Sequence, residues 1–494
     1  MEEINELIQE RIKKLKNLQD AGIDPYGGSF DVKHKAADII RNFGGMPKDE
    51  LEAKGEECTI AGRIVAFRDF GKAAFAHIQD ATGKIQVYLK KDIIGGDFSI
   101  LKNLDIGDIV GLSGPLFRTR TDELTIEVKK FRFLCKSLRP LPEKWHGLKD
   151  TEIRYRQRYL DLIVNPQVRE LFVKRSRLVR AIRNFFDAEG FLEVETPMMH
   201  QIPGGAAARP FKTHHNALGI DLYLRIAPEL YLKRLLVGGY EKVYEINKNF
   251  RNEGISTKHN PEFTMLEFYI SYADYNYLMD FTEKLVTHLC METSGTLRVP
   301  YGDDPESVID FTPPWPRLSI QKAMEKEGVS PDVFKSIDAA KEYALKNNID
   351  IAKKASLGKI LDEIFKEKVE PKLIQPVFIT DYPVELSPLA KRKKESPELV
   401  ERFELFMAGR EVANAFSELN DPADQKGRFL EQVEERRMGD EEANQMDEDF
   451  VRALEYGMPP AAGEGIGIDR LLMILTNSQS IRDVILFPQL KPEQ

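Results

Sequence analysis

The feature that most constrains the fold of this chain is a series of short alternating segments between Cys58 and Cys135. Alternating apolar and polar residues with glycine-bearing turns between them are typical of β-strands that bury one face. Five such strands within fewer than eighty residues favour a small closed barrel over a large open sheet. The five segments are TIAGRIVAF, KAAFAHIQD, KIQVYLK, GDIVGLSG and ELTIEVKKFRFL.

The same region differs in charge from the rest of the chain. Residues 60–136 hold 13 Lys and Arg against 9 Asp and Glu, whereas the whole chain has a net charge of -9. A locally basic module on an acidic protein indicates a polyanion that is bound in one place. The strands and the charge together predict a five-stranded barrel of the OB type.

The alternation also predicts which barrel side chains point outward. Ile85, Val87 and Leu89 would face the core. Exposed aromatic rings among polar groups offer a stacking surface for unpaired bases, although Phe75 packed beneath a loop is an equally good interpretation. The outward residues would be Phe75, His77, Gln79, Gln86, Tyr88 and Glu123.

A chain of 494 residues is too long for one hydrophobic core, so two or more domains are expected. An amphipathic helix opens the chain, with Ile4, Leu7, Ile8, Ile12, Leu15 and Leu18 on one stripe, and a proline-containing linker spans 136–150. We expect a first domain over 1–145, with this helix and the barrel. An α+β domain would follow over 146–494, with a helical insertion near 319–368.

Cysteine use and hydropathy bear on the compartment. Cys58, Cys135 and Cys290 are far apart and form no CxxC pair, which favours a reducing compartment and speaks against a zinc site. The first residues, MEEINELIQERIKKLKNL, are charged throughout, unlike a secretory signal, and no run approaches the ~20 apolar residues of a membrane span. A cytoplasmic location is expected.

The stretch FRNEGISTKHNPEFTMLEFY, at 250–269, mixes charges of both signs with large rings. Alternating segments flank its polar loop, which predicts an antiparallel hairpin. On the second strand one face would be apolar, and the other would carry Phe263, Met265, Glu267 and Tyr269. A face that carries a carboxylate in a large domain more often lines a pocket than faces bulk water, although a solvated outer face is the alternative.

Three further clusters carry polar groups. Glu229 follows a proline at a predicted helix start. In the second cluster a helical spacing of Glu411 and Glu418 competes with strand alternation, which would place Glu411 on one face with Ala413 and Ala415. In the third, GEGIGIDR leads into a helix whose Arg470 suits a phosphate. Its GxGxG spacing does not match a dinucleotide-binding fingerprint.

These groups suit the activation of a carboxylate by ATP. The reaction joins two anions, so the protein must hold them in line and neutralise their charge. Arg251 could bridge both anions through its fork, and Glu404 and Glu411 could hold Mg²⁺. Glu229 and Glu418 have no phosphate role, which indicates a substrate with two positive charges, namely a basic amino acid.

At these motifs the chain resembles the class II aminoacyl-tRNA synthetases, and most closely their lysine-specific branch of bacterial type. The 250–269 stretch resembles their motif 2, GEGIGIDRLLMIL their motif 3, and FLEVETPMM with the helix before it their motif 1. The resemblance extends from about Cys58 to Pro492. It implies a homodimer built on motif 1, an OB-fold anticodon domain, a six-stranded antiparallel catalytic sheet, and the transfer of ATP-activated lysine to the 3′ end of tRNA.

The resemblance also assigns roles to single residues. The lysine site would comprise Gly205, Glu229, Glu267, Tyr269, Asn414 and Glu418. The ATP site would comprise Arg251, Glu253, His259, Asn260, Phe263 and Arg470, with Arg251 and Arg470 catalytic. Mg²⁺ would bind Glu404 and Glu411, and the anticodon would be read by Arg68, Phe75, Gln86 and Glu123. Two details depart from this picture: strict alternation turns Arg68 toward the core, and Lys258 stands where the family usually carries Arg.

Three rival functions remain open at this point. An aspartyl or asparaginyl synthetase shares the architecture, but its acidic or amide substrate would need a cation where Glu418 stands. A ligase that lysylates a protein would tend to lack the barrel. A nucleic-acid-binding protein with a decayed catalytic domain is opposed by the presence of every carboxylate named above.

Overall fold

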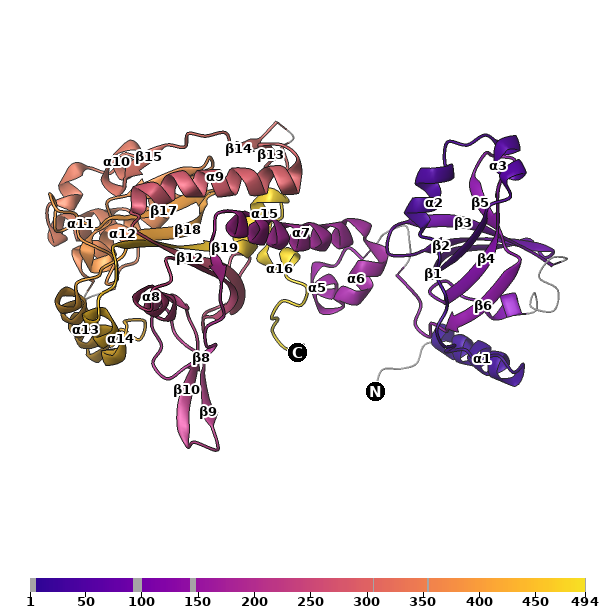
Figure 1. Cartoon of the computed structure of the whole chain (residues 1–494), viewed down its shortest axis with the longest axis horizontal. Helices are drawn as coiled ribbons and strands as arrows, with labels where there is room; N and C mark the ends of the chain where they lie inside the picture. Colours follow the sequence, from indigo (N-terminus) through magenta and orange to yellow (C-terminus); the bar gives the residue numbers. More distant parts are fainter. Residues whose placement is uncertain (1–5, 92–99, 143–147, 305, 353–354, 494) are drawn as a thin grey trace. The chain divides into compact units, whose positions relative to one another are not determined.

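The computed structural model describes residues 6–91, 100–142, 148–304, 306–352 and 355–493. The chain forms two compact units, Met1–Lys149 and Asp150–Gln494 (Figure 1). The domain boundary expected at residue 145 lies in 143–147, outside the described residues, as does Ile4 of the predicted first helix. No helix in the described ranges has the length and apolar character that a membrane crossing requires.

The first unit is a barrel preceded by helices. Its helices are α1 (Glu6–Asp20), α2 (Ala36–Phe43) and α3 (Lys48–Lys54). Its strands are β1 (Glu57–Asp69), β2 (Ala73–Gln79), β3 (Lys84–Lys90), β4 (Ile109–Arg118), β5 (Leu124–Glu127) and β6 (Lys130–Cys135). The first helix is confirmed, but only part of its predicted stripe is covered, because Leu18 is buried whereas Leu7 and Ile12 are exposed.

The strands of the barrel follow the order β1-β2-β3-β5-β4-β6, and β1 also pairs with β4. The sheet has six strands where the sequence predicted five, because the segment ELTIEVKKFRFL divides into β5 and β6. At the division the backbone changes partner: the Val128 amide donates to the Tyr88 carbonyl, and the Lys129 amide donates to the Ser113 carbonyl.

A β-bulge at Val65 decides which way Arg68 points. The register between β1 and β2 shifts between Ile64 and Ala66, so Arg68 lies opposite Phe75 and is exposed. The extra residue inverts the alternation beyond it. The expectation from strict alternation, that Arg68 faces the core, is therefore wrong.

Alternation holds elsewhere in the barrel with two exceptions. Ile85, Val87 and Leu89 are buried as predicted. Gln79 and Gln86 were predicted to be exposed on the outer face; Gln86 does lie on that face opposite His77, but both side chains are covered there. Burial of Gln86 is satisfied by its hydrogen bonds to Glu123 and Thr125, and Gln79 lies at the strand end opposite Arg63 of β1.

The second unit contains both helices and strands, distributed along the whole of its sequence. Its helices are α5 (Thr151–Arg156), α6 (Arg158–Val164), α7 (Pro166–Ala188), α8 (Glu229–Val237), α9 (Tyr275–Ser294), α10 (Ile320–Lys326), α11 (Ile337–Lys346), α12 (Leu357–Lys368), α13 (Pro422–Arg437), α14 (Glu448–Glu455), α15 (Ile468–Leu475) and α16 (Ile481–Val484), with short 3₁₀ turns at Pro331–Phe334, Glu370–Lys372 and Val384–Leu386. Its strands are β7 (Leu192–Glu193), β8 (Met199–His200), β9 (Lys212–His215), β10 (Ile220–Leu224), β11 (Lys242–Phe250), β12 (Glu262–Ser271), β13 (Arg298–Pro300), β14 (Val308–Asp310), β15 (Arg317–Ser319), β16 (Val377–Thr380), β17 (Arg402–Met407), β18 (Arg410–Ser417) and β19 (Ala461–Gly467). The segment predicted as a helical insertion contains α10, α11 and α12.

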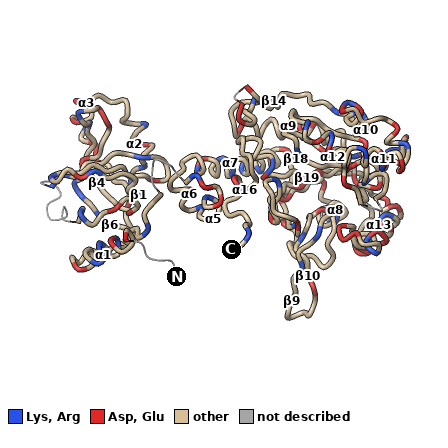
Figure 2. Tube along the Cα trace, turned by 180° about the vertical axis from the view of Figure 1, so that it is seen from behind, with Lys and Arg blue, Asp and Glu red and all other residues tan. Residues whose placement is uncertain are grey.

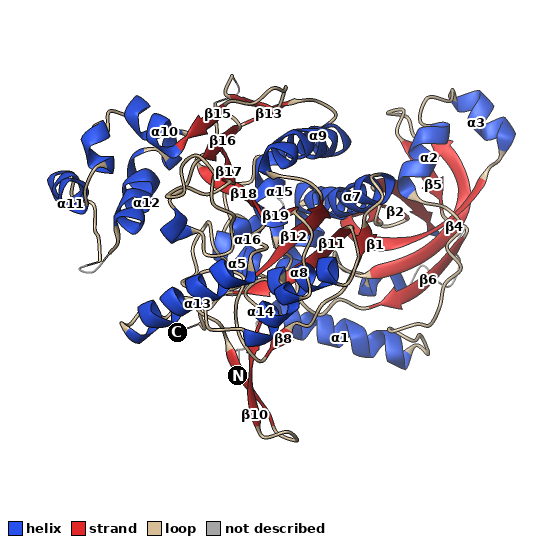
Figure 3. Ribbon diagram, turned by 60° about the vertical axis from the view of Figure 1, so that its left-hand side comes forward, coloured by secondary structure: helices blue, strands red, loops and turns tan. Residues whose placement is uncertain are grey.

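An eight-stranded sheet runs through this unit in the order β15-β16-β17-β18-β19-β12-β11-β7 (Figure 3). The six strands from β16 to β11 pair antiparallel, and β15 and β7 add one parallel pairing at each edge. The expected antiparallel sheet is therefore present, with two short edge strands added. The predicted hairpin of motif 2 is β11 and β12.

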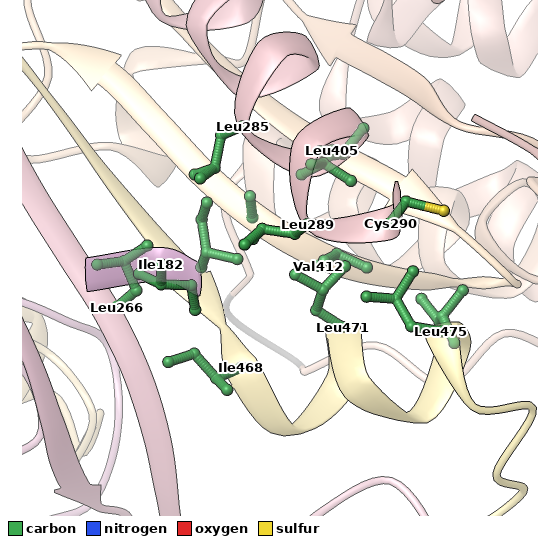
Figure 4. Close-up of a cluster of buried hydrophobic side chains, with 14 of the residues drawn as sticks. Ile182, Leu266, Leu285, Leu289, Cys290, Leu405, Val412, Ile468, Leu471 and Leu475 are labelled. Atoms are coloured by element: carbon green, nitrogen blue, oxygen red, sulfur yellow. The ribbon is translucent and has the colours of Figure 1, made fainter. Parts of the chain in front are cut away.

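Three helices cover one face of this sheet. Apolar residues of α7, α9 and α15 pack against alternate residues of the central strands in one continuous core. Figure 4 shows Leu266 of the sheet beside Ile182 of α7, Leu405 and Val412 close to Leu289 of α9, and Leu471 of α15 next to Val412. With this face closed by helices, the opposite face of the same strands is left to form a site.

The segment FLEVETPMM was predicted as one strand and is not. Only β7 and β8, of two residues each, are extended pairs. Between them the Thr196 hydroxyl donates to Glu245, and Pro197 has no amide hydrogen to offer a sheet. The chain therefore leaves the sheet soon after Glu193.

Candidate active site

A cavity of about 720 Å³ opens on the face of the large sheet that the three core helices leave free. Phe263, Met265, Glu267 and Tyr269 of β12 line it, whereas Leu266 and Phe268 lie in the core behind them. The two faces predicted for this strand are confirmed. Of the residues predicted from the sequence for the lysine, ATP and metal sites, every one borders this cavity except Glu418, whose carboxylate is buried just behind its wall next to Gly463.

At one end of the cavity two predicted carboxylates share a buried lysine. The Lys233 ammonium donates to Glu229 Oε1 at 2.6 Å and forms an ion pair with Glu418. Lys233 is completely buried, and Glu229 and Glu418 are 6% and 1% exposed. Burial opposes a charge on Lys233, but the two carboxylates outweigh it and raise the pKa of the ammonium above its ordinary value. The site therefore contains an internal ammonium.

The sequence interpretation missed Lys233, although a signal for it was present. Lys233 follows Glu229 by four residues on α8, the spacing at which helix side chains meet. The spacing alone does not show that this face of α8 is turned toward the cavity, or that Glu418 lies against Lys233. Both depend on the tertiary fold.

A third carboxylate, that of Glu267, lies beside this ion cluster. The Tyr269 hydroxyl donates to Glu267 Oε1 at 2.8 Å, and both side chains are buried. Burial raises the pKa of Glu267 to about 8, and the nearby Glu229 adds to the effect. The cavity end therefore holds three carboxylates against one ammonium.

Two glycines make room for these groups. A Cβ at Gly463 of β19 would overlap Tyr269 Cε1 and would lie 2.5 Å from Glu418 Oε1. Gly205 has φ +87, and a Cβ there would lie 3.0 Å from Glu229 Cβ. The first glycine of the GxGxG run is thus required by close packing of the site.

Arg251 follows β11 at the rim of the motif 2 loop. Its guanidinium lies over the Phe263 ring, 5.1 Å from the ring centre, and its Nε has no hydrogen-bond partner in the described part of the chain. Burial lowers the pKa of Arg251, although Glu253 and Glu411 oppose that change. An oriented, unsatisfied guanidinium is suited to bind an anion. Glu253, predicted to belong to the ATP site, is exposed at the same rim.

Arg470 connects the motif 2 loop to β18. It donates to the Glu411 carbonyl at 2.8 Å, and its other terminal nitrogen lies 3.3 Å from His259 Nε2. Burial and the charge of Arg470 lower the pKa of His259. Asn260 is buried, and both ends of its amide are engaged within the chain, by the Glu262 carbonyl and the Gln489 amide.

A second β-bulge brings Glu411 to the cavity. The register between β17 and β18 shifts, so that Leu405 pairs with Ala413 and Phe406 with Glu411, which leaves Val412 extra. Glu411 therefore lines the cavity with Asn414, whereas Ala413 is in the core. The strand interpretation of this stretch was right, but its placement of Glu411 with Ala413 and Ala415 was wrong.

Glu404 lies across from Asn414 in the pairing of β17 with β18. It accepts hydrogen bonds from Arg402 at 2.5 Å and from the Tyr382 hydroxyl at 2.8 Å. Burial raises the pKa of Glu404 to about 7; Arg402 opposes this, while Glu411 and Asp362 add to it. Such mutual repulsion of carboxylates is relieved by a divalent cation, and oxygen donors of this kind suit Mg²⁺.

Within the described ranges, no group of three or more His, Cys, Asp or Glu side chains is arranged to hold a metal ion. Mg²⁺ in nucleotide sites is commonly held by one or two carboxylates together with phosphate oxygens of the substrate. The pair of Glu404 and Glu411 fits that kind of partial donor set.

The predicted anticodon residues lie together on the barrel surface. The Phe75 ring lies 4.7 Å from that of Tyr88 and 6.2 Å from that of Phe70, centre to centre. Glu123 joins this surface through His77 Nε2 at 3.1 Å and the Gln86 amide at 2.5 Å. Figure 2 shows basic and acidic residues interspersed along both units. Phe75 is half-buried among these neighbouring rings.

Comparison with known families gives two matches. Residues 150–491 match the family described as tRNA synthetases class II (D, K and N). Residues 58–134 match the family described as OB-fold nucleic acid binding domain.

Comparison with curated proteins gives relatives along the full length. The lysine–tRNA ligase of Pelotomaculum thermopropionicum is 59% identical, over 100% of this chain and 96% of its own length. That of Moorella thermoacetica is 58% identical, over 100% and 99% of the two chains. That of Bacillus subtilis is 54% identical, over 99% and 98%.

Proposed function

Because the chain belongs to the class II tRNA synthetases, within their branch of lysine–tRNA ligases, we propose that its cavity joins lysine to ATP and that the lysyl group then passes to the 3′ end of tRNA. In the first step a lysine carboxylate oxygen bonds to the α-phosphorus and pyrophosphate leaves. In the second, a terminal hydroxyl of tRNA bonds to the lysyl carbonyl carbon and AMP leaves.

The charge of the buried end of the cavity is the observation that carries this proposal. Glu229 and Glu418 both pair with the buried Lys233, and Glu267 lies beside them. When all three carboxylates are ionised, Lys233 balances one of them, and lysine brings two ammonium groups for the other two. We assign the side-chain ammonium to Glu418 and Tyr269, and the α-ammonium to Glu229 with the Gly205 backbone.

The other end of the cavity suits ATP and the carboxylate of the substrate. Arg251 has an unsatisfied guanidinium nitrogen there and can hold the carboxylate against the α-phosphate. Arg470 and His259, linked side by side, are placed for the phosphates. Phe263, with Glu253 at the rim, is assigned to adenine, while Asn260 supports the loop from within and Asn414 supports the carboxylate end.

Glu404 and Glu411 are the residues that would hold Mg²⁺, which when bound neutralises phosphate charge. Burial raises the pKa of Glu404 and the charge of Glu411 raises it further, so a cation between them would be favoured, which supports this assignment. Arg470 also donates to the Glu411 carboxylate, so a residue proposed to bind the metal contacts one proposed to bind phosphate.

For the barrel we propose recognition of the tRNA anticodon. Phe75 would stack on a base, while Arg68, Gln86 and Glu123 would contact base edges. The support is their common surface: Arg68 lies opposite Phe75, and Glu123 is bonded to Gln86. The match of residues 58–134 to a nucleic-acid-binding domain agrees with this proposal.

We further propose a homodimer and a cytoplasmic location. Apolar side chains near motif 1 are exposed in the single chain, including Tyr159, Val173, Leu192, Met199 and Phe487. A second copy would cover them, as exposed apolar patches of this kind often mark interfaces. Cys58, Cys135 and Cys290 are all unpaired, which suits a reducing compartment.

The family description covers enzymes for aspartate and asparagine as well as lysine, so the amino acid needs a direct test. Pyrophosphate exchange into ATP should depend on lysine and not on aspartate or asparagine. Glu418→Gln should raise the lysine KM by more than about 100-fold, because a buried ammonium left without its partner costs ~3–5 kcal/mol. The control is Glu283→Gln, a buried glutamate outside the cavity that accepts from the Trp315 amide. Exchange driven by aspartate would refute the assignment.

A further inference from the structure

Lys233 is the one residue of the ion cluster that no part of the proposed reaction uses. It lies on α8, is completely buried, and bridges Glu229 and Glu418, which come from positions 189 residues apart in the sequence. Its ammonium also lies 5.2 Å from the centre of the Phe416 ring. A buried cation next to a site proposed to bind the ammonium groups of the substrate needs a physical explanation.

We propose that Lys233 is a positioning residue that holds Glu229 and Glu418 apart and sets the charge of the amino-acid site to match a substrate with two ammonium groups. This inference rests on the proposed function. Lys233 acts through the two glutamates and does not itself contact the substrate.

The hydrogen bonding of the glutamates supports this role. Lys233 engages Oε1 of Glu229 and Oε2 of Glu418. Both oxygens of Glu418 are buried without a hydrogen-bond partner among the residues that the structure describes; Oε2 has the ion pair with Lys233, and Oε1 has neither. Oε1 lies beside Gly463, at the position that a Cβ there would crowd. A buried carboxylate oxygen without a hydrogen-bond donor is costly, so a ligand that supplies a donor to Oε1 would be favoured.

The charge count explains why a lysine is needed at this position. Without a cation between them, Glu229 and Glu418 could both be ionised only as adjacent buried charges, which is costly. Lys233 neutralises one of these charges and leaves the other for one substrate ammonium. Glu267, with its pKa raised to about 8, supplies a further charge when a second ammonium binds beside it and lowers that pKa. The carboxylate of lysine then pairs with Arg251, so the filled site is neutral.

Lys233 also favours the ionised form of both glutamates. Burial raises the pKa of Glu229 and Glu418, and Lys233 is the largest influence that lowers it. The other titratable or charged groups facing the cluster are Glu267, Tyr269 and Arg402, from β12 and β17. Without Lys233, the pKa of both glutamates would rise further, and they would bind an ammonium less well.

The test compares Lys233→Met and Lys233→Gln with the wild type in lysine-dependent pyrophosphate exchange. Lys233→Met removes the charge and keeps the stem, and Lys233→Gln keeps a donor and is the milder change if the methionine variant does not fold. We expect the lysine KM to rise about 100-fold and about 10-fold, respectively, with the ATP KM unchanged. In both variants the excess in lysine KM over wild type should shrink as the pH is raised, because the glutamates regain their charge.

The matched control is Lys136→Met in the barrel. Lys136 is also buried between two carboxylates, those of Asp105 and Asp108, at 2.5 and 2.9 Å. This variant should lose stability and keep the wild-type lysine KM. A lysine KM within about threefold of wild type in Lys233→Gln, or an excess that does not change with pH, would overturn the inference. If the wild type itself showed no lysine-dependent exchange, the proposed function would fail instead, so the two failures are distinct.

Discussion

Gly463→Ala probes the tightest part of the proposed lysine site with a single methyl group. Gly463 lies in β19 with its neighbours Gly465 and Gly467, and none of the three has a positive φ, so an alanine is compatible with the backbone at each. Their surroundings differ sharply. A Cβ at Gly463 would overlap the buried Tyr269 ring and lie 2.5 Å from Glu418 Oε1, whereas at Gly467 the nearest atom is 3.7 Å away.

The magnitude follows from what must move. Neither Tyr269 nor Glu418 has exposed space into which to turn, since both are at most 3% exposed. Overpacking of this kind typically costs ~1–3 kcal/mol. If about 2 kcal/mol of it falls on the lysine-bound state, the lysine KM rises about 30-fold. The ATP KM should stay the same, because the phosphate end of the cavity is built from Arg251 and Arg470.

Pyrophosphate exchange at varied lysine and varied ATP gives both KM values, and thermal melting reports folding. Gly467→Ala is the control for inserting alanine in the same strand and should keep the lysine KM within about threefold. Gly465→Ala should be intermediate, because its contact at 2.8 Å is the flexible end of Met265. Equal lysine KM values for Gly463→Ala and wild type would refute the placement of Glu418 at the ammonium.

Three further predictions test other parts of the structure. Glu464 is buried with a pKa raised to about 8 by burial, and it lies 2.6 Å from the Thr282 hydroxyl, which donates to the Leu278 carbonyl and can accept from the protonated acid. The folded chain therefore keeps a proton that the unfolded chain releases above its ordinary pKa near 4.5, and stability is lost as the pH rises toward 8. Glu464→Gln should melt like wild type near pH 5 and should be more stable at pH 8, by up to about 4 kcal/mol; an advantage that is the same at both pH values would contradict the assignment. Phe75→Ala should weaken tRNA binding by ~1–3 kcal/mol through lost stacking and leave lysine-dependent exchange unchanged, and equal tRNA affinity would remove Phe75 from the anticodon site. Glu411→Gln should raise the Mg²⁺ concentration for half-maximal exchange, and an unchanged Mg²⁺ dependence would exclude this carboxylate as a ligand.

The sequence by itself determined the elements whose pattern is local. Alternation over β12 separated the core face from the face with Glu267 and Tyr269, because successive strand residues point to opposite sides. The proline before Glu229 marked the start of α8. The motifs gave the family, and the pairing of carboxylates with one arginine indicated a basic amino acid.

Only the tertiary structure decided which groups meet and which way they point after an irregularity. The bulges at Val65 and Val412 turn Arg68 and Glu411 to faces that strict alternation denies them, and a bulge depends on the partner strand. Lys233 is one of 71 Lys and Arg residues in the sequence, and nothing near it shows that Glu418 lies against it. The contact matters because Lys233 is buried: a charge removed from water is stable only when the fold places an opposite charge beside it.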